Sequence, residues 1–187
     1  MSYCTYVKQL APNEQPEHQH YHQYEYGFII EDDNELFERL VLEINQAGLS
    51  WTTILKKQAH FKKAYHQFNI KKVAGYKEAD RERLLQDAGI IRNRLKVDAA
   101  IHNAQVILQL QKEYGSFKQW LDAHHPLTKP EWVKLFKKHF KFTGGEIVNE
   151  FLMSTGYLPG AHDADCPVYK AIAATKPPWM KTKSPGK

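Results

Sequence analysis

Apolar residues recur every three or four positions along most of the chain, which is the period of an amphipathic helix. The clearest case is the stretch 93–115, where Val97, Ile101, Ala104 and Ile107 follow one another at helical spacing. The same period predicts further helices over residues 31–49, 51–68, 78–89, 116–125, 130–140 and 145–156. No stretch shows the alternation of a half-buried strand. The pattern therefore predicts an all-α fold of about seven helices.

The two ends of the chain lack this period. The first thirty residues contain Pro12 and Pro16 and predict an irregular, aromatic-rich arm. Residues 175–187 are rich in proline and lysine without a core-forming pattern, and they predict a mobile basic tail. Residues 1–174 are enough for one all-α domain with a sizeable core.

Composition adds mainly the sign of the charge. With 42% hydrophobic and 25% charged residues, the chain has the make-up of an ordinary globular protein. It has no apolar run near the ~20 residues of a membrane span, and its N-terminus lacks a signal-peptide pattern, so we expect no membrane association and a cytoplasmic location. The net charge of +5 favours a polyanionic partner, although solvated surface lysines explain it equally well.

The two cysteines stand near opposite ends of the chain, at Cys4 and Cys166. In a reducing compartment such a pair favours metal binding over a disulfide. His162 can join Cys166, because the H-x₃-C spacing lets one turn present both side chains. Near Cys4 the candidates are His18, His20 and His22. Two thiolates and two imidazoles would form a closed, structural zinc site, but two unrelated buried cysteines explain the pattern equally well.

A second candidate site is the stretch "LLQDAGIIRNRLKVDAAIHNA", residues 84–104, in which a short helix ends at Gly89 and a long one begins a few residues later. Three cations, Arg92, Arg94 and Lys96, gather at the start of the second helix. A helix N-terminus with nearby cations suits a phosphate of a nucleic-acid backbone. The alternative is an ordinary helical hairpin with solvated arginines.

Glu43 falls at the edge of the apolar arc of the helix over 31–49. It is either a boundary residue that reaches water or a buried acid that lines a cavity, and a buried carboxylate would require a cationic or donor-rich partner. Aromatic residues that could stack on nucleobases are dense near the N-terminus, although they could equally be ordinary core and surface residues: Tyr3, Tyr6, Tyr21, Tyr24, Tyr26 and then Trp51.

Taken together, these stretches resemble the DNA-3-methyladenine glycosylase I family, within the helix-hairpin-helix DNA glycosylases. The resemblance covers nearly the whole chain apart from the basic tail. It is carried, in the family's order, by Cys4 with the following aromatic Tyr6, then "YHQYEYG", "LEINQAGLSW", "LQDAGIIRNRLKV", "KFTGGEIVNEFLMSTG" and "HDADC". The pairing of "QAGLSW" with "DAGIIR" is the most specific part of it.

The resemblance implies a helix-hairpin-helix glycosylase fold with two helical lobes around a base pocket. It also implies that one structural zinc ion joins the termini through Cys4, His22, His162 and Cys166. The implied activity is monofunctional hydrolysis of the N-glycosidic bond of 3-methyladenine in double-stranded DNA, by a monomer that flips the base out of the duplex and releases free 3-methyladenine.

By the same resemblance, Glu43 is the catalytic residue, which accepts hydrogen bonds from the base and complements its charge. Tyr21 hydrogen-bonds in the pocket and Trp51 stacks on the base. Tyr6 and Tyr26 stand where the family usually has tryptophan, and they are expected to bind the base with a smaller face. The residues implied in DNA binding are those of the hairpin: Gly89, Ile91, Arg92, Arg94 and Lys96.

The chain departs from the family in three further respects. Ile44 replaces what is often a glycine beside Glu43, the segment between Trp120 and Phe140 is shorter than usual, and "AQVILQLQ" offers no carboxylate in the helix after the hairpin. The last feature is a mark of this branch. The altered aromatics and the short segment motivate an alternative, a catalytically impaired protein that binds DNA or modified bases. A zinc hydrolase is disfavoured because four protein ligands saturate the metal.

Overall fold

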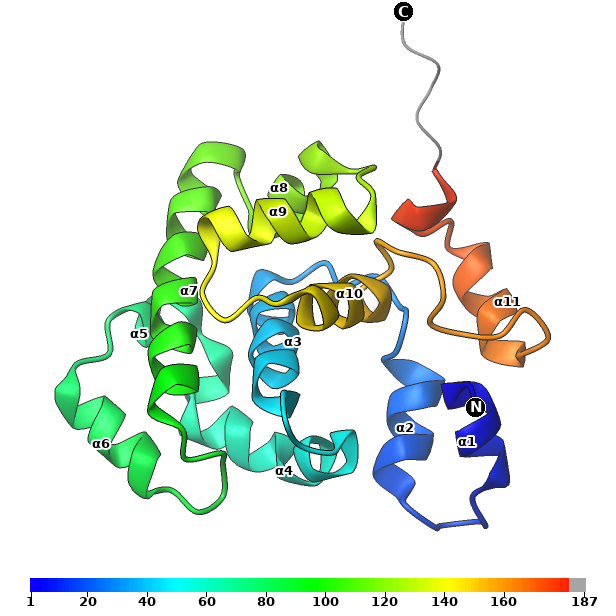
Figure 1. The fold of residues 1–187 in the computed structure, drawn as a ribbon, viewed down its shortest axis with the longest axis horizontal. Helices are drawn as coiled ribbons and strands as arrows, with labels where there is room; N and C mark the ends of the chain where they lie inside the picture. Colours follow the sequence, from blue (N-terminus) through cyan, green and yellow to red (C-terminus); the bar gives the residue numbers. More distant parts are fainter. Residues whose placement is uncertain (182–187) are drawn as a thin grey trace, which may run out of the picture.

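The computed structural model describes residues 1–181, and in this range the protein is helical without a β-strand, as the sequence pattern predicted (Figure 1). Within these residues no helix combines the length and apolar character that crossing a membrane requires. The α-helices are α1 (Tyr3–Gln9), α2 (Pro16–Tyr24), α3 (Asp33–Gln46), α4 (Trp51–Ala64), α5 (Ile70–Ala74), α6 (Glu78–Gln86), α7 (Arg94–Tyr114), α8 (Phe117–His124), α9 (Lys129–His139), α10 (Gly145–Ser154) and α11 (Pro167–Ala174).

Helix α3 lies at the centre of the fold, where it contacts α4, α5, α7, α8 and α10 (Figure 1). The carboxylate of Asp32 begins this helix by accepting hydrogen bonds from two free N–H groups of its first turn. Because neighbours cover α3 on several sides, burial extends beyond its apolar stripe. Arg39, Glu43 and Asn45 are as buried as the leucines around them.

The hairpin between α6 and α7 turns tightly against α4. The backbone N–H of Gly89 donates to the Asp87 carboxylate at 2.7 Å. A Cβ atom at Gly89 would lie only 3.0 Å from Nδ1 of His60 on α4, so the turn approaches α4 more closely than a side chain at this position allows. Lys57 of α4 adds a hydrogen bond to the carbonyl of Ala88.

The N-terminal arm is helical, which corrects the expectation of an irregular segment. Ser2 begins α1 by accepting a hydrogen bond from the N–H of Thr5. In α2 the buried positions are His18, Tyr21 and His22, which follow helical spacing. The periodicity exists, but polar and aromatic side chains carry it, and a search for apolar residues does not register them.

Two other helices are absent from the sequence prediction because they are short. Helix α5 buries only Ile70 and Val73, and α11 buries only Val168 and Ile172, so neither spans enough turns to establish a period. The helix predicted over 51–68 instead ends at Ala64 and continues as a separate 3₁₀ turn over His66–Phe68.

The C-terminal segment differs in part from the mobile tail expected over 175–187. Pro178–Met180 forms a 3₁₀ turn in which Pro178 is buried. The N–H of Trp179 donates to the carbonyl of Gly156 at 3.2 Å, and its ring lies 5.9 Å from that of Tyr169. These residues therefore pack on the fold. The remainder of the expected tail, 182–187, lies outside the described residues.

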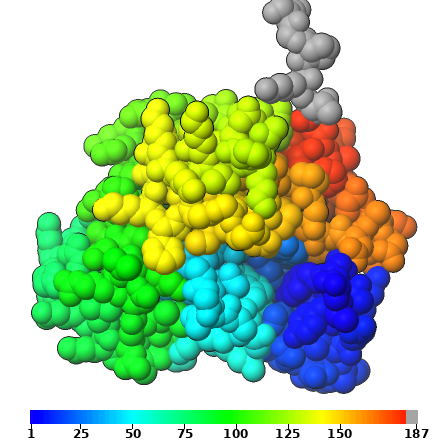
Figure 2. Space-filling model, in the orientation of Figure 1, coloured from blue at the N-terminus to red at the C-terminus, as the bar shows by residue number. Residues whose placement is uncertain are grey.

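The beginning of the chain and α11 lie together on one side of the molecule. Figure 2 shows the dark-blue N-terminal segment against the orange segment that contains α11. The Ser2 hydroxyl donates to the Asp163 carboxylate, and Nζ of Lys8 lies 3.6 Å from the Asp165 carboxylate. This contact joins parts of the chain that are about 160 residues apart in sequence.

Asp33, in the first turn of α3, fastens α3 to α7 and α8. Its carboxylate accepts hydrogen bonds from the backbone N–H groups of Phe117 and Lys118, at 2.8 and 3.0 Å. A third comes from the side-chain amide of Gln111, at 2.7 Å. One carboxylate thus satisfies free N–H groups at the start of α8 and ties two helices to the central one.

We expect Asp33→Ala to lower the free energy of unfolding by about 2 to 4 kcal/mol, because three hydrogen bonds to an ionised group are lost. Urea denaturation measures the change. Glu35→Ala is the matched control, since Glu35 is an exposed acid in the same helical turn, and it should cost less than about 1 kcal/mol. Equal losses in the two variants would contradict this role for Asp33.

Candidate active site

A cavity of about 370 Å³ lies between the central helix α3, the N-terminal helices, α10 and the loop that leads to α11. Its lining contains three carboxylic acids and no lysine, arginine or histidine, so its charged side chains are all acidic. The lining residues are Ser2, Tyr3, Tyr21, Tyr26, Glu43, Gln46, Trp51, Glu150, Gly160, Ala161 and Asp163.

Glu43 presents its carboxyl group to this cavity from α3 and is only 4% exposed. Among the described residues no protein group hydrogen-bonds to it. Burial raises the pKa of Glu43 to about 8; the positive charge of Arg39 opposes this shift and the nearby Glu150 adds to it. Of the two alternatives that the sequence left open, the structure shows the buried acid that lines a cavity.

Aromatic rings form much of the remaining wall. The ring of Tyr21 lies edge-on to Trp51, with centroids 5.2 Å apart, and 5.5 Å from the ring of Tyr26. Tyr3 packs edge-on against Tyr26 at 5.4 Å. The indole N–H of Trp51 is buried and has no hydrogen-bond partner in the described part of the chain. This part of the wall is therefore largely aromatic.

Arg39 stands behind this wall, a role that the sequence did not suggest. It lies one helical turn before Glu43 and is itself buried. Its guanidinium group is 4.9 Å from the centre of the Tyr21 ring and donates to the Tyr21 hydroxyl at 3.2 Å. Glu25 compensates its charge through an ion pair at 3.2 Å. Arg39 thereby positions Tyr21 and moderates the cost of the buried acid.

The predicted base-binding residues Tyr21, Tyr26 and Trp51 all line the cavity with Glu43, whereas Tyr6 does not. Tyr6 stacks on the outer side of Tyr3, with centroids 6.2 Å apart, and its hydroxyl donates to the side chain of Gln15. Tyr3 reaches the cavity in its place, because it lies one turn nearer to the start of α1.

Sequence reasoning missed the other two acids of the cavity. Glu150 lies on α10, and its carboxylate accepts a hydrogen bond from the Tyr26 hydroxyl at 3.2 Å. Asp163 follows His162 and accepts the hydrogen bond from Ser2. Glu150 stood in the quoted motif "KFTGGEIVNEFLMSTG", but an acid beside the apolar residues of a helix usually faces water, so the sequence pattern does not single it out. Asp163 stood in the quoted motif "HDADC", but only as a spacer between possible ligands.

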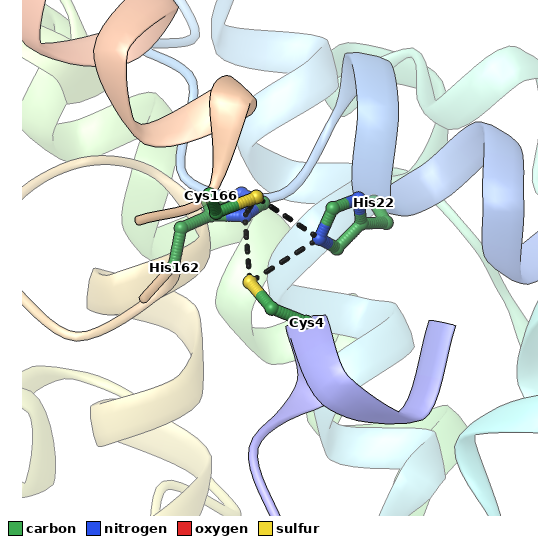
Figure 3. A group of neighbouring side chains, drawn as sticks. All are labelled: Cys4, His22, His162 and Cys166. Atoms are coloured by element: carbon green, nitrogen blue, oxygen red, sulfur yellow. Dashed lines mark hydrogen bonds between the residues drawn. The ribbon is translucent and has the colours of Figure 1, made fainter. Parts of the chain in front are cut away.

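The side chains of Cys4, His22, His162 and Cys166 converge at one buried point beside the cavity (Figure 3). They come from α1, α2, the loop before α11 and the start of α11, and their ligand atoms all lie within 4.8 Å of one another. Of the three histidines considered beside Cys4, only His22 takes part. His18 bonds to Tyr3 and to Thr52 instead.

The geometry of this cluster fits a tetrahedral metal ion. The distances between a sulfur and a nitrogen ligand atom are 3.3, 3.4, 3.8 and 3.9 Å. A tetrahedral zinc ion with Zn–S bonds of about 2.3 Å and Zn–N bonds of about 2.0 Å places sulfur and nitrogen about 3.5 Å apart. Nε2 of His162 lies 2.7 Å from the carbonyl of Tyr26, and a proton held there leaves Nδ1 free to bind the ion.

The protonation states of the cluster also suit a cation. Burial, together with the neighbouring His162, lowers the pKa of His22 to about 4, and burial lowers that of His162, so both imidazoles are neutral as ligands must be. Burial raises the pKa of Cys4 to about 11, and a divalent cation would compensate the thiolate that the surroundings disfavour.

The predicted DNA-binding residues of the hairpin differ in their exposure to solvent and in their partners. Arg92 is exposed, and Arg94 is exposed but forms an ion pair with Glu78 at 2.7 Å. Ile91 packs partly against the core, next to the tight turn at Gly89.

Lys96 does not belong with these exposed cations. It is buried, and its ammonium group donates to the carbonyls of Asn45 and Ala47, at 2.9 and 2.7 Å. These carbonyls lie at the C-terminal end of α3, where a helix leaves acceptors free and favours a positive charge. In this structure the side chain of Lys96 therefore caps α3.

Comparison with known proteins identifies the fold and the family. Solved structures of 3-methyladenine DNA glycosylase I share this fold: one crystal structure has a TM-score of 0.74 and 33% identity, over 85% of this chain and 96% of that one. A tyrosine-to-phenylalanine variant in complex with 3-methyladenine has a TM-score of 0.76 and 29% identity, over 90% and 97%. The fold is thus that of a DNA glycosylase.

Sequence comparison is more specific. A model of the methyladenine glycosylase family matches residues 11–132. DNA-3-methyladenine glycosylase 1 of Escherichia coli (strain K12) is 36% identical over 188 residues, which cover 90% of this chain and 97% of that protein. The chain belongs to the methyladenine glycosylase family.

The raised pKa of Glu43 predicts that the free energy of unfolding depends on pH. Between about pH 4.5 and about pH 8 the folded protein keeps a proton that the unfolded chain has released, so the free energy of unfolding falls as the pH rises through this window. Glu43→Gln removes this loss. We expect the variant to exceed the wild type by about 2 to 4 kcal/mol near the upper end and to approach it near the lower end, since one pKa unit corresponds to ~1.4 kcal/mol.

Urea denaturation at several pH values measures this difference. Glu35→Gln, the same change at an exposed position of α3, should leave the pH dependence of the wild type in place. A difference between Glu43→Gln and the wild type that stays constant across the window would show that Glu43 ionises freely in the folded protein.

Proposed function

We propose that this protein is a monomeric DNA glycosylase of base-excision repair, which hydrolyses the N-glycosidic bond of 3-methyladenine in alkylated double-stranded DNA. The observation that carries the proposal is the Glu43 carboxyl group, which is buried in an aromatic, acidic cavity and has no hydrogen-bond partner among the described residues. A buried acid without a partner is costly, and a cationic ligand would offset that cost.

The charge of the substrate fits this cavity. Alkylation at N3 gives adenine in DNA a fixed positive charge, and the base becomes neutral when it leaves. Glu43 balances that charge while the base is bound, and the low dielectric of the pocket strengthens the interaction. Tyr21, Tyr26 and Trp51 offer faces on which a purine can stack.

The reaction breaks the bond between N9 of the base and C1′ of the sugar, and the electron pair leaves with the base. Water then adds to C1′ and releases a proton. Because the substrate is already charged, departure of the base needs no proton donor. The α7 stretch "AQVILQLQ" accordingly carries no acid, and the polar side chains of the cavity are carboxyl, amide, hydroxyl and indole groups, which fits hydrolysis without an amine nucleophile.

Reaching the buried cavity requires that the base leave the stack, which costs a few kcal/mol and less for a damaged base. On this proposal the turn between α6 and α7 acts as the hairpin that holds a DNA phosphate. Ile91 supplies a backbone N–H group there, and the exposed Arg92 adds charge. The N–H of Gly89 contributes if the phosphate displaces the Asp87 carboxylate, to which it donates in this structure. Arg94 contributes if the phosphate displaces Glu78.

We further propose that one zinc ion binds Cys4, His22, His162 and Cys166 and holds the two ends of the chain together. Four protein ligands leave no open position, so the ion is structural. A cytoplasmic location, where thiols stay reduced, suits the two free cysteines.

Incubation of the protein with methylated DNA, followed by chromatography of the released bases, tests the activity. We expect release of 3-methyladenine, and we expect Glu43→Gln to reduce its rate by about 10- to 100-fold, because a neutral amide cannot balance the cation. Glu35→Gln should retain the rate of the wild type. If the wild type binds free 3-methyladenine but releases none from DNA, the alternative of a catalytically impaired binding protein replaces this proposal.

Elemental analysis and thermal denaturation test the zinc proposal. We expect one zinc per chain, and we expect chelation or His22→Ala to lower the melting temperature by about 10 °C, since a link between distant segments is lost. His20→Ala is the matched control, because His20 lies on the same helix and faces solvent. Wild-type protein that contains no zinc and melts at the same temperature with chelator would rule the ion out.

A further inference from the structure

The cavity contains a second acid whose position the family comparison does not explain. Glu150 reaches it from α10, whereas Glu43 reaches it from α3. The Tyr26 hydroxyl donates to Glu150 at 3.2 Å, which holds the carboxylate at the cavity wall. Burial raises the pKa of Glu150, although the hydrogen bond from Tyr26 opposes the shift.

No cation neutralises Glu150 within the described residues. The positive charge of Lys129 acts on it through space, but Lys129 forms its ion pair with Glu146, at 3.2 Å, one turn earlier on α10. The third acid of the cavity, Asp163, also accepts a hydrogen bond from a hydroxyl group, that of Ser2. It differs from Glu150 in its position, because it directly follows the proposed metal ligand His162. Glu150 is thus a carboxylate held by neutral groups and turned toward the space that a ligand would fill.

Two carboxylates in one cavity affect ligands of different charge differently. Burial is the main cause of the raised pKa of Glu43, and the charge of Glu150 adds to it, because two ionised carboxylates in one cavity repel each other. A ligand with a fixed positive charge stabilises both ionised forms and relieves the repulsion. A neutral ligand of similar shape gains nothing from it. The second carboxylate therefore increases discrimination between charged and neutral bases more than it increases general affinity.

We propose that Glu150, positioned by the Tyr26 hydroxyl, is a second residue that recognises the positive charge of the flipped base and sets the preference for cationic over neutral purines. This inference rests on the proposed function, because it assigns the pocket to a purine. It gives Tyr26 a role beyond stacking, because its hydroxyl group orients the Glu150 carboxylate. An aromatic residue without a hydroxyl could not form this hydrogen bond.

Calorimetric titration with two probes tests the proposal. One probe is neutral 3-methyladenine, measured at slightly alkaline pH, and the other is the 3,9-dimethyladeninium ion, whose charge is fixed. The measured quantity is the ratio of the two dissociation constants, compared between variants, so that the steric effect of the extra methyl group cancels. Circular dichroism melting checks that each variant is folded.

We expect Glu150→Gln to weaken binding of the fixed cation about tenfold relative to the neutral probe, because one of two compensating charges is lost. Tyr26→Phe keeps both acids and should shift the ratio in the same direction by a smaller factor. Glu146→Gln is the matched control, since it removes the same charge from an exposed position one turn away on α10. It should leave the ratio unchanged.

The outcomes separate this inference from the proposed function. If the wild type excises 3-methyladenine and prefers the cation, but Glu150→Gln keeps the same ratio, only the role of Glu150 is refuted. If Glu150→Gln weakens the binding of both probes equally, Glu150 contributes to the shape of the pocket and not to charge recognition, and the inference is also refuted. A wild type that neither binds the probes nor excises the base refutes the proposed function, and this inference with it.

Discussion

The cavity depends on contacts that hold the two ends of the chain together. The converging side chains of the Cys4, His22, His162 and Cys166 cluster lie next in sequence to much of the cavity wall. Tyr3 precedes Cys4, Tyr21 precedes His22, and Ala161 and Asp163 flank His162. Only a small apolar group, including Val168 and Ile172, packs around the cluster. This side of the pocket therefore rests on the cluster and on the neighbouring aromatic group of Tyr21 and Tyr26, outside the main hydrophobic core.

The other half of the pocket depends on the rigidity of α3. Helices on several sides hold this helix in place, so it can present a carboxyl group to a cavity without moving that group to solvent. Arg39, one turn before Glu43, shows how the fold limits the cost: its charge acts on Glu43 through space, while its guanidinium group forms an ion pair with Glu25. An acid held in this way is costly to the empty protein and available to a cationic ligand.

The sequence predicted those features that depend on the residue pattern within one segment of the chain. The apolar period located α3, α4 and α6–α10, and the residue types and their resemblance to a family named the four residues of the cluster. It could not predict α1 and α2, since α1 buries only Cys4 and the buried residues of α2 are histidine and tyrosine. Nor could it place Glu150 or Lys96, because each lies on a helix whose pattern gives an acid or a lysine a solvated face. What they contact is decided by a helix distant in sequence, and no local pattern contains that information.

The composition of the cavity bears on how much chemistry the protein must supply. Three acids and no basic side chain line the cavity, and a ligand that is already positive stabilises the ionised forms that burial disfavours in the empty protein. A charged base departs without a proton donor, so on the proposed function the pocket needs only to select the charge and exclude the neutral bases that make up almost all of DNA. Selection is the harder task, because a neutral adenine has nearly the same shape. A second carboxylate sharpens that selection where closer packing could not, since it acts on the one property that distinguishes the damaged base most strongly.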